Sequence, residues 1–233
     1  MSGAGAAPAP DGAPAARVPV VGFDLDMTLV DSSTRIGTCL AAALAAQGVA
    51  VTPAQVWPTI GVPLEVALRQ LAPGAGEAVR AAVAADYRAR HDAPSAPPVP
   101  ALPGAADALA AVRAAGGRTL VVSAKVDRAV ALVLAEAGLA HLVDVVVGGR
   151  FAEAKGEVLV RLGATAYVGD HPGDVVAART AGVEQVAVLT GPVPEAQLRA
   201  AGATTVLADL TALPGWLEGH TARLREGAVG DGR

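Results

Sequence analysis

The chain has 233 residues, of which 52% are hydrophobic and 17% charged, so it can bury a sizeable core and lacks the composition of a disordered protein. Its 18 basic and 22 acidic residues give a net charge of −4, which argues against nucleic acid as a partner. Cys39 is the only cysteine, which excludes an intrachain disulfide and a thiolate zinc site and favours a reducing, cytoplasmic location. No apolar run approaches the roughly 20 residues of a membrane span, so no membrane partner is expected.

Both ends of the chain have compositions that disfavour a packed core. Residues 1–17 are rich in Ala, Pro and Gly and show no periodic apolar pattern. Such a segment buries too little apolar surface to offset the entropy lost on ordering, so we expect a disordered tail. Residues 219–233 are small and polar without a sustained apolar stripe, and we expect a flexible tail there too.

Between these ends, short β-branched runs alternate with segments of helical periodicity. Five runs have the continuous apolar character of buried parallel strands: Val18–Phe23, Thr119–Val122, Val143–Val147, Ala166–Val168 and Gln185–Leu189. This alternation predicts an α/β fold with a doubly wound, Rossmann-like parallel sheet, made of residues 18–31 and 100–218. Ligands of such sheets bind at the carboxyl ends of the strands.

The first strand is followed by a long helical segment, residues 32–99, in place of a single crossover helix. Within it, Thr52 and Gln55 form a capping box with Pro53 at the first helical position. A proline-rich stretch at 94–103 then returns the chain to the sheet and is expected to act as a semi-rigid hinge. We therefore predict an inserted α-helical cap domain over the strand ends.

Two carboxylates follow the first strand directly. Asp24 and Asp26 stand at positions i and i+2, so their side chains point the same way in an extended segment. Like charges at the end of a buried strand are costly unless a cation or a shared proton relieves them. A short D-x-D pattern also occurs by chance at a solvated strand end, and alone it favours that interpretation.

Further polar residues follow the other predicted strands. Asp170 could bind a metal ion, and Asp174 could do so or cap the helix that follows. Ser123 ends the second predicted strand and Lys155 follows a Gly-Gly turn; singly, they indicate a turn serine and a surface lysine. Because all of them lie at or beyond the carboxyl ends of parallel strands, they can converge on one site.

In this order the motifs resemble the haloacid dehalogenase-like hydrolase superfamily, in particular its phosphoglycolate phosphatase-like members with a helical cap. The similarity covers most of the chain from Val18 to about Leu217. Its strongest marks are the D-x-D-x-T-L-V-D-S run at Asp24–Ser32 and the G-D-x-x-x-D run at Gly169–Asp174. The resemblance implies a Mg²⁺-dependent phosphatase that hydrolyses small phosphate monoesters through an aspartyl-phosphate intermediate.

The resemblance also implies a role for each matching residue. Asp24 would be the nucleophile, and Asp26 the general acid and then the general base. Mg²⁺ would be held by Asp24, the backbone carbonyl of Asp26, Asp170 and Asp174, since an anionic carboxylate attacks an anionic phosphate poorly without a cation. Lys155 would offset negative charge on the nucleophile and the phosphate.

Other positions are implied to contact the substrate. Thr28 and Ser123 would donate hydrogen bonds to phosphoryl oxygens. Gly61 lies in a Gly-Val-Pro-Leu turn that resembles the family's substrate-specificity loop. Five charged residues of the predicted cap could reach a substrate carboxylate: Arg35, Arg69, Arg88, Arg90 and His91.

The sequence departs from the family pattern at three positions near the site. Met27 stands where relatives usually have glycine, and His171 where they often have Ser or Thr. Gly156 replaces the proline that usually follows the lysine. None of these changes removes a reacting group.

Two other functions remain alternatives. A phosphomutase uses the same two aspartates but returns the phosphoryl group to the substrate, and a non-catalytic phosphate-ligand binding module would keep the fold without turnover. A pure binder has no need of Asp26, which favours the phosphatase. The expected partner is a small phosphorylated metabolite, and we expect a monomer or a homodimer.

Overall fold

The computed structural model describes residues 17–230, so the predicted tail at 1–17 lies outside the described residues except for Arg17. Its core is a six-stranded parallel sheet of order β3-β2-β1-β4-β5-β6. The strands are β1 (Val20–Phe23), β2 (Arg118–Val122), β3 (Val145–Val147), β4 (Ala166–Gly169), β5 (Glu184–Val188) and β6 (Thr205–Leu207). The predicted α/β fold is confirmed, and β6 is a strand that the sequence analysis missed.

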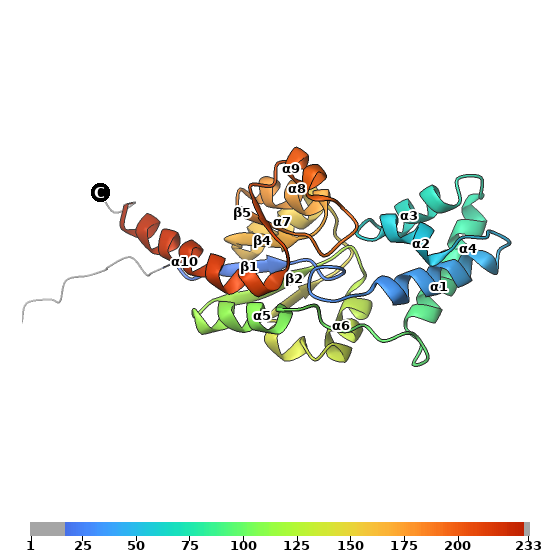
Figure 1. The fold of residues 1–233 in the computed structure, drawn as a ribbon, viewed down its shortest axis with the longest axis horizontal. Coiled ribbons are helices and arrows are strands. Elements are labelled where there is room, and N and C mark those ends of the chain that lie inside the picture. The colour runs from blue at the N-terminus through green and yellow to red at the C-terminus, as the bar shows by residue number, and fades with distance from the viewer. Residues whose placement is uncertain (1–16, 231–233) are drawn as a thin grey trace, which may run out of the picture.

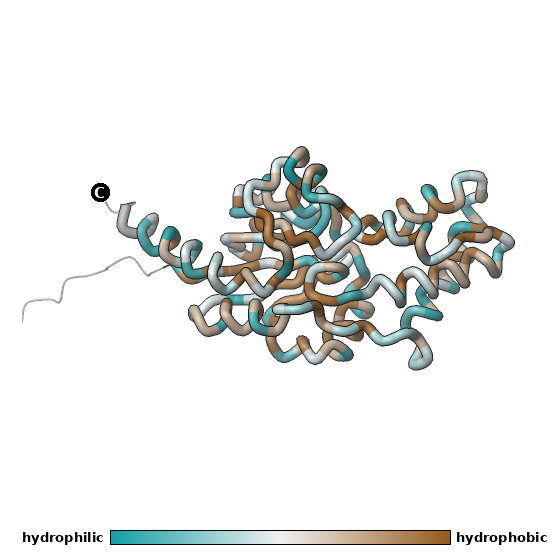
Figure 2. The backbone as a smooth tube through the Cα atoms, viewed as in Figure 1, coloured by the Kyte–Doolittle hydropathy of each residue, from teal (hydrophilic) through white to brown (hydrophobic). Residues whose placement is uncertain are grey.

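Side chains along the strands alternate between the two faces of the sheet. Phe23, Val121 and Val168 pack on one face, whereas Val122 and Tyr167 pack on the other. All five are fully buried. Because both faces are covered, the strands are apolar along their whole length, which explains their continuous apolar runs. Figure 2 shows these hydrophobic segments at the centre of the core.

Helices cover both faces of the sheet (Figure 1). One face carries α5 (Ala105–Ala114), α6 (Asp127–Glu136), η2 (Ala140–Leu142), η3 (Leu210–Ala212) and the start of α10 (Leu213–Gly230). The other carries α7 (Glu153–Leu162), α8 (Pro172–Ala181) and α9 (Glu195–Ala201). The chain builds the sheet outward from β1 to β3 and then from β4 to β6, so the strand order reverses between β1 and β4. Open α/β sheets bind ligands at such a switch point.

The segment between β1 and α5 forms a separate helical lobe at one end of the molecule (Figure 1). It contains α1 (Ser33–Ala45), α2 (Pro53–Val56), η1 (Trp57–Thr59), α3 (Leu64–Leu71) and α4 (Glu77–His91). The lobe has its own buried core, in which Leu40, Leu68 and Val83 pack together with Cys39. We refer to residues 32–99 as the insert.

Local signals identified one helix start correctly and another incorrectly. The predicted capping box is present at the start of α2. At α8 the predicted N-cap position is wrong, because His171 holds it and its Nδ1 accepts from the Gly173 N–H at 3.0 Å, but Asp174 still helps to cap the helix as the N3 residue of a capping box. Pro172, which favours the first helical position, starts the helix earlier than expected. Asp174 accepts from the His171 N–H at 3.1 Å and faces the interior.

The C-terminal region also differs from its prediction. The expected flexible tail at 219–233 is wrong as far as Gly230, because α10 continues to that residue. His220 is buried and lies 3.0 Å from the Glu184 carboxylate, which Arg223 contacts at 2.8 Å. Glu184 is 36 residues away from His220 in the chain, so local composition carried no signal of this anchor. Neither α10 nor any other helix of residues 17–230 is long and apolar enough to span a membrane.

Candidate active site

Three aspartates meet at the carboxyl ends of the central strands. Asp24 follows β1, Asp170 follows β4, and Asp174 lies in the first turn of α8. One carboxylate oxygen from each lies within 4.8 Å of the others, and all three side chains are almost fully buried. The structure therefore brings together the three side chains that the sequence placed at strand ends.

Lys155 lies inside this cluster and not on the surface. It extends from α7, and its Nζ is 3.0 Å from Asp24 Oδ1 and 2.7 Å from Asp174 Oδ1. Burial by itself lowers the pKa of a lysine, but the carboxylates of Asp174 and Asp24 outweigh it and hold the pKa of Lys155 well above its usual value. Lys155 is thus a fixed positive charge beside both carboxylates.

The ionised cluster has an excess of negative charge, because three carboxylates face one ammonium group. Burial, with the carboxylates of Asp174 and Asp26, raises the pKa of Asp24 to about 7 despite the opposing effect of Lys155. Burial, with the carboxylates of Asp24 and Asp174, also raises the pKa of Asp170 well above its usual range. Asp170 Oδ2 is buried and accepts no hydrogen bond from the described residues, and the buried Asp24 Oδ1 has the Lys155 ammonium group beside it at 3.0 Å. Oxygen ligands of this kind fit a hard divalent cation such as Mg²⁺.

Two glycines allow the backbone to approach the cluster closely. A Cβ at Gly169 would lie 2.2 Å from Asp174 Oδ2, and a Cβ at Gly191 would lie 1.9 Å from Asp170 Oδ2. Both positions therefore require glycine. The Thr28 hydroxyl, predicted to contact the phosphoryl group, donates to Asp170 Oδ1 at 2.9 Å, which places it against the carboxylate cluster.

The chain turns sharply at Met27, directly after Asp26. Met27 has a φ of 58°, in the left-handed region that favours glycine and costs another residue about 1–2 kcal/mol. Its N–H donates to the Val30 carbonyl at 2.9 Å, and its carbonyl accepts from the Thr190 hydroxyl. This backbone conformation gives a physical reason for glycine at this position, which the family resemblance leads us to expect. Here the two hydrogen bonds stabilise the same turn although the residue is methionine.

Asp26 lies beside the cluster and is held by Lys125. The Lys125 Nζ is 3.3 Å from Asp26 Oδ2 and 3.1 Å from His91 Nε2. His91 is the last residue of α4 and belongs to the insert. Because an ammonium group only donates, His91 Nε2 accepts, and its Nδ1 carries the hydrogen that points at Asp92 Oδ1, 3.0 Å away. Burial and the nearby Lys125 lower the pKa of His91, which agrees with this neutral tautomer. The insert thus reaches Asp26 through Lys125.

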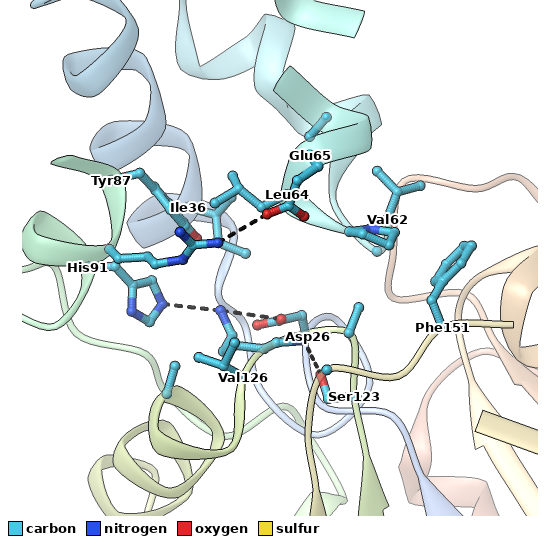
Figure 3. A pocket seen from close by; sticks show the side chains of 18 of the residues that line it. Asp26, Ile36, Val62, Leu64, Glu65, Tyr87, His91, Ser123, Val126 and Phe151 are labelled. Atoms are coloured by element: carbon cyan, nitrogen blue, oxygen red, sulfur yellow. Dashed lines mark hydrogen bonds and ion pairs between the residues drawn. The ribbon is translucent and has the colours of Figure 1, made fainter. Parts of the chain in front are cut away.

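Asp24 and Asp26 lie at a cavity of about 440 Å³ between the insert and the core (Figure 3). Asp24, Asp26 and Ser123 line it from the core, and Gly61 lines it from the insert. Gly61 has a φ of 103°, and a Cβ there would lie 3.0 Å from His171 Cδ2, so the turn of the insert fits closely against the core. The other predicted site residues belong to the carboxylate cluster.

Only some of the charged insert residues considered from the sequence reach the cavity. Arg88 and His91 line it, whereas the other three do not. One of those three, Arg35, is buried and donates to Glu136 of α6 at 2.6 Å, so it joins the insert to the core.

Three residues that build the site were missed by the sequence analysis: Lys125, Thr190 and Gly191. Lys125 stands just past β2, so the rule that polar residues at strand ends form the site could have found it. The other two follow β5 in the same way. The local pattern thus indicates the positions of these three residues but not the distant residues that they contact.

Comparison with known proteins identifies relatives of this chain. A family profile described as haloacid dehalogenase-like hydrolase matches residues 21–188. The chain is 34% identical over 199 residues to "Probable phosphatase IndB" of Dickeya dadantii (strain 3937), with 78% of this chain and 86% of that protein covered. It is 32% identical over 180 residues to a phosphoglycolate phosphatase of Cereibacter sphaeroides, with 71% of this chain and 83% of that protein covered.

Solved structures share the fold. The crystal structure of a predicted phosphoglycolate phosphatase from Haemophilus somnus 129pt matches with a TM-score of 0.76 at 22% identity, covering 86% of this chain and 98% of that one. At this identity the likeness concerns the fold alone. Together with the profile match and the curated relatives, it shows that the chain belongs to the haloacid dehalogenase-like hydrolase family, as a phosphatase of the phosphoglycolate phosphatase-like type that its motifs predicted.

Proposed function

We propose that the enzyme requires Mg²⁺ and hydrolyses small phosphate monoesters through an aspartyl-phosphate intermediate. The observation that carries this proposal is the convergence of Asp24, Asp170 and Asp174 within 4.8 Å, beside a cavity that Asp26 also lines. This arrangement combines a nucleophile, an acid and a cation site at the carboxyl ends of β1 and β4. The names of the curated relatives support a phosphorylated metabolite as substrate.

Asp24 and Asp26 divide the hydrolysis into two steps. A carboxylate oxygen of Asp24 attacks the phosphorus atom and the bond between phosphorus and the alcohol oxygen breaks, while Asp26 donates a proton to that oxygen. Water then attacks the phosphorus of the aspartyl-phosphate and Asp26 accepts its proton. Phosphate leaves, and the Asp24 carboxylate is restored.

Mg²⁺ fits the cluster because the three carboxylates carry more negative charge than the single Lys155 ammonium group neutralises. We assign its binding to Asp24, Asp170, Asp174 and the backbone carbonyl of Asp26. When bound, the ion offsets the negative charge of the nucleophile and the phosphate. It also favours the ionised form of Asp24, whose pKa burial raises in the metal-free protein.

The remaining predicted residues complete the phosphate site. Ser123 donates a hydrogen bond to a phosphoryl oxygen, and Lys155 offsets charge at Asp24. Thr28 orients Asp170 through its 2.9 Å hydrogen bond. Its second role, which the family resemblance implies, is a hydrogen bond to a phosphoryl oxygen. The insert, with Gly61 at its turn, acts as a cap that admits the substrate and excludes bulk water.

We assign Lys125 the positioning of Asp26. Its ammonium group lies between the Asp26 carboxylate and His91 of α4, at 3.3 and 3.1 Å. Because His91 belongs to the insert, this arrangement orients the acid when the insert lies against the core. Catalysis and cap position are thereby linked through one side chain.

The test is phosphate release from acetyl phosphate and a panel of alkyl phosphates, measured with excess Mg²⁺ or with a chelator. We expect metal-dependent release that is absent in Asp24→Asn and normal in the matched control Asp107→Asn, an exposed aspartate of α5. Release that persists in Asp24→Asn would remove Asp24 from the nucleophile role. Labelled phosphate that stays on an organic product would indicate a phosphomutase, and binding without release would indicate a binding module.

We also propose a cellular location for the enzyme. Cys39 is free and buried in the insert core, in keeping with the reducing cytoplasm in which we propose that the enzyme acts.

A further inference from the structure

The cavity above Asp26 is larger than a two-carbon substrate requires. Its volume of about 440 Å³ lies in the range of about 300–1,000 Å³ that holds ligands of drug size. A phosphoryl group with a glycolyl group fills only part of such a space. The remaining walls therefore face the alcohol part of a larger ester.

These walls are mainly apolar. Six of the larger apolar side chains come from both the insert and the core: Ile36, Val62, Leu64, Tyr87, Val126 and Phe151. Figure 3 shows them around the opening above Asp26. Val126 lines the cavity and is 49% exposed, so an apolar group of a ligand in the cavity would cover it. We refer to these six residues as the apolar wall.

Most lysine and arginine side chains of the cavity lining are already paired with a carboxylate. Three cations of the lining have a carboxylate partner in the same lining: Lys125 with Asp26 at 3.3 Å, Arg88 with Glu65 at 3.1 Å and Arg128 with Asp92 at 3.7 Å. Arg150 is exposed and donates to its neighbouring Gly149 carbonyl. Only the Lys125–Asp26 pair is largely buried, so a second anionic group of a substrate would have to compete with Asp26 for Lys125 or rely on the exposed Arg88, Arg128 and Arg150, where water screens the attraction.

We infer that the alcohol part of the substrate is mainly apolar, an alkyl or aryl group that carries neither a carboxylate nor a second phosphate. This inference rests on the proposed phosphatase function and names its substrate class. An apolar alcohol covers the apolar wall, leaves the three ion pairs intact and places the ester oxygen near Asp26. The class differs from phosphoglycolate, the substrate in the name of one curated relative.

The inference predicts a dependence on chain length. Each methylene that leaves water for an apolar wall strengthens binding by about three- to fourfold. In n-alkyl phosphates from ethyl to hexyl the alcohols have nearly the same acidity, so the chemical step stays constant along the series. We therefore expect kcat/KM to rise about three- to fourfold per methylene until the cavity is filled.

The experiment measures kcat/KM for this series, and for phosphoglycolate against propyl phosphate, which is similar in size. A rising series with propyl phosphate above phosphoglycolate supports the inference; a flat series, or phosphoglycolate above propyl phosphate, overturns it. Acetyl phosphate separates the two proposals. If the wild type hydrolyses it and Asp24→Asn does not, the phosphatase proposal stands even when the series is flat. No release from any of these compounds overturns both.

Two exposed valines provide a matched pair of variants. Val126→Ser makes the apolar wall more polar, whereas Val160→Ser changes an equally simple side chain, 59% exposed on α7 and outside the cavity. We expect Val126→Ser to lower the hexyl-to-ethyl ratio of kcat/KM by about three- to tenfold and Val160→Ser to leave it unchanged. An unchanged ratio in Val126→Ser, or an equal drop in Val160→Ser, would contradict the role of the wall.

Discussion

The core side of the cavity is built from buried charged groups, whereas the insert side is mainly apolar with exposed charges. On the core side, Lys155 lies within 3.0 Å of Asp24 and Asp174, and all three side chains are almost fully buried. On the insert side, the Arg88–Glu65 pair is exposed, and most of the remaining lining is apolar. Buried charges interact strongly because little water screens them, whereas exposed pairs contribute little. We therefore expect the core side to decide the reaction and the insert side to decide which substrate enters it.

The largest effect is expected at the nucleophile. Asp24→Asn replaces a carboxylate by a poor nucleophile of the same size, so kcat/KM should fall by about 10⁴-fold or more. The fold should persist, because the substitution removes one of three crowded carboxylates. Steady-state kinetics with acetyl phosphate and a circular-dichroism melt test both points. A comparable loss with acetyl phosphate in a variant of the apolar wall would contradict the assignment of the reaction to the core side alone.

Asp26 should show a loss that depends on the leaving group. Asp26→Ala removes the proton donor, so kcat for alkyl phosphates should fall by about 10²–10⁴-fold. Acetate leaves acetyl phosphate without protonation, so that substrate should lose much less. Equal losses for the two substrate types would contradict the acid role and reduce Asp26 to a structural residue.

Lys125 joins the two sides and should give an intermediate effect. Lys125→Met leaves Asp26 in place but loosens its carboxylate, so kcat for alkyl phosphates should fall about tenfold to 100-fold with little change in KM. Lys125→Arg keeps the positive charge and should therefore retain more of the wild-type kcat than Lys125→Met does. The control is Arg128→Met, which alters the looser 3.7 Å pair with Asp92 and should change kcat by about twofold or less. A loss in KM alone, or the same loss for acetyl phosphate, would argue against positioning.

An exposed pair of the insert should matter little. Arg88→Gln breaks the contact with Glu65, in which both side chains are about half exposed or more. Such pairs contribute about 0.2–1 kcal/mol, so kcat/KM for alkyl phosphates should change by about fivefold or less. A drop as large as that of Asp26→Ala, measured with the same esters, would show that the insert takes part in the chemistry.

The anchor of α10 lies far from the cavity and should affect only stability. Burial raises the pKa of Glu184, but hydrogen bonds from Arg223 and with His220 outweigh it and lower the pKa below its usual 4.5. The ionised form is thus favoured in the folded state, and its contribution is present above pH 4.5 and lost as the pH falls through the lower folded value. Urea unfolding should show that Glu184→Gln lowers the free energy of unfolding by about 0.2–1 kcal/mol at neutral pH.

The same urea unfolding experiment, repeated at lower pH, checks the direction of this pH dependence. The difference in the free energy of unfolding between wild type and Glu184→Gln should shrink as the pH falls below 4.5 through the lower folded pKa, because the wild-type carboxyl then takes up a proton. A difference that grows on acidification would overturn the assignment of the anchor. Turnover at neutral pH should be the same in both proteins.

Much of the fold and of the active site could be predicted from the sequence. Buried parallel strands read as apolar runs, and the rule that ligands bind at their carboxyl ends singled out Asp24, Asp170 and Ser123 before any contact was known. Lys155 was different: by its local pattern it was a surface lysine, and only the family motif indicated a role. Its burial depends on α7 packing over the sheet, which no local signal describes.

The misses share one physical cause. Lys125 acquires its place through contacts with Asp26 and with His91, which are 99 and 34 residues away in the chain. Helix α10 is held by Glu184, and β6 is a short strand that pairs only at the edge of the sheet. In each case the stabilising partner is distant in sequence, so local composition and periodicity carry little information about it.

The sequence by itself determined the parallel α/β core, the long helical segment after the first strand and the aspartates at the strand ends, because these follow from periodicity and from residue types at fixed spacing. Only the tertiary structure decided that Lys155 is buried among the carboxylates, that Lys125 links Asp26 to the insert and that the cavity wall is apolar with its charges paired. Those properties depend on which distant side chains share a low-dielectric space, and that arrangement exists only once the chain has folded.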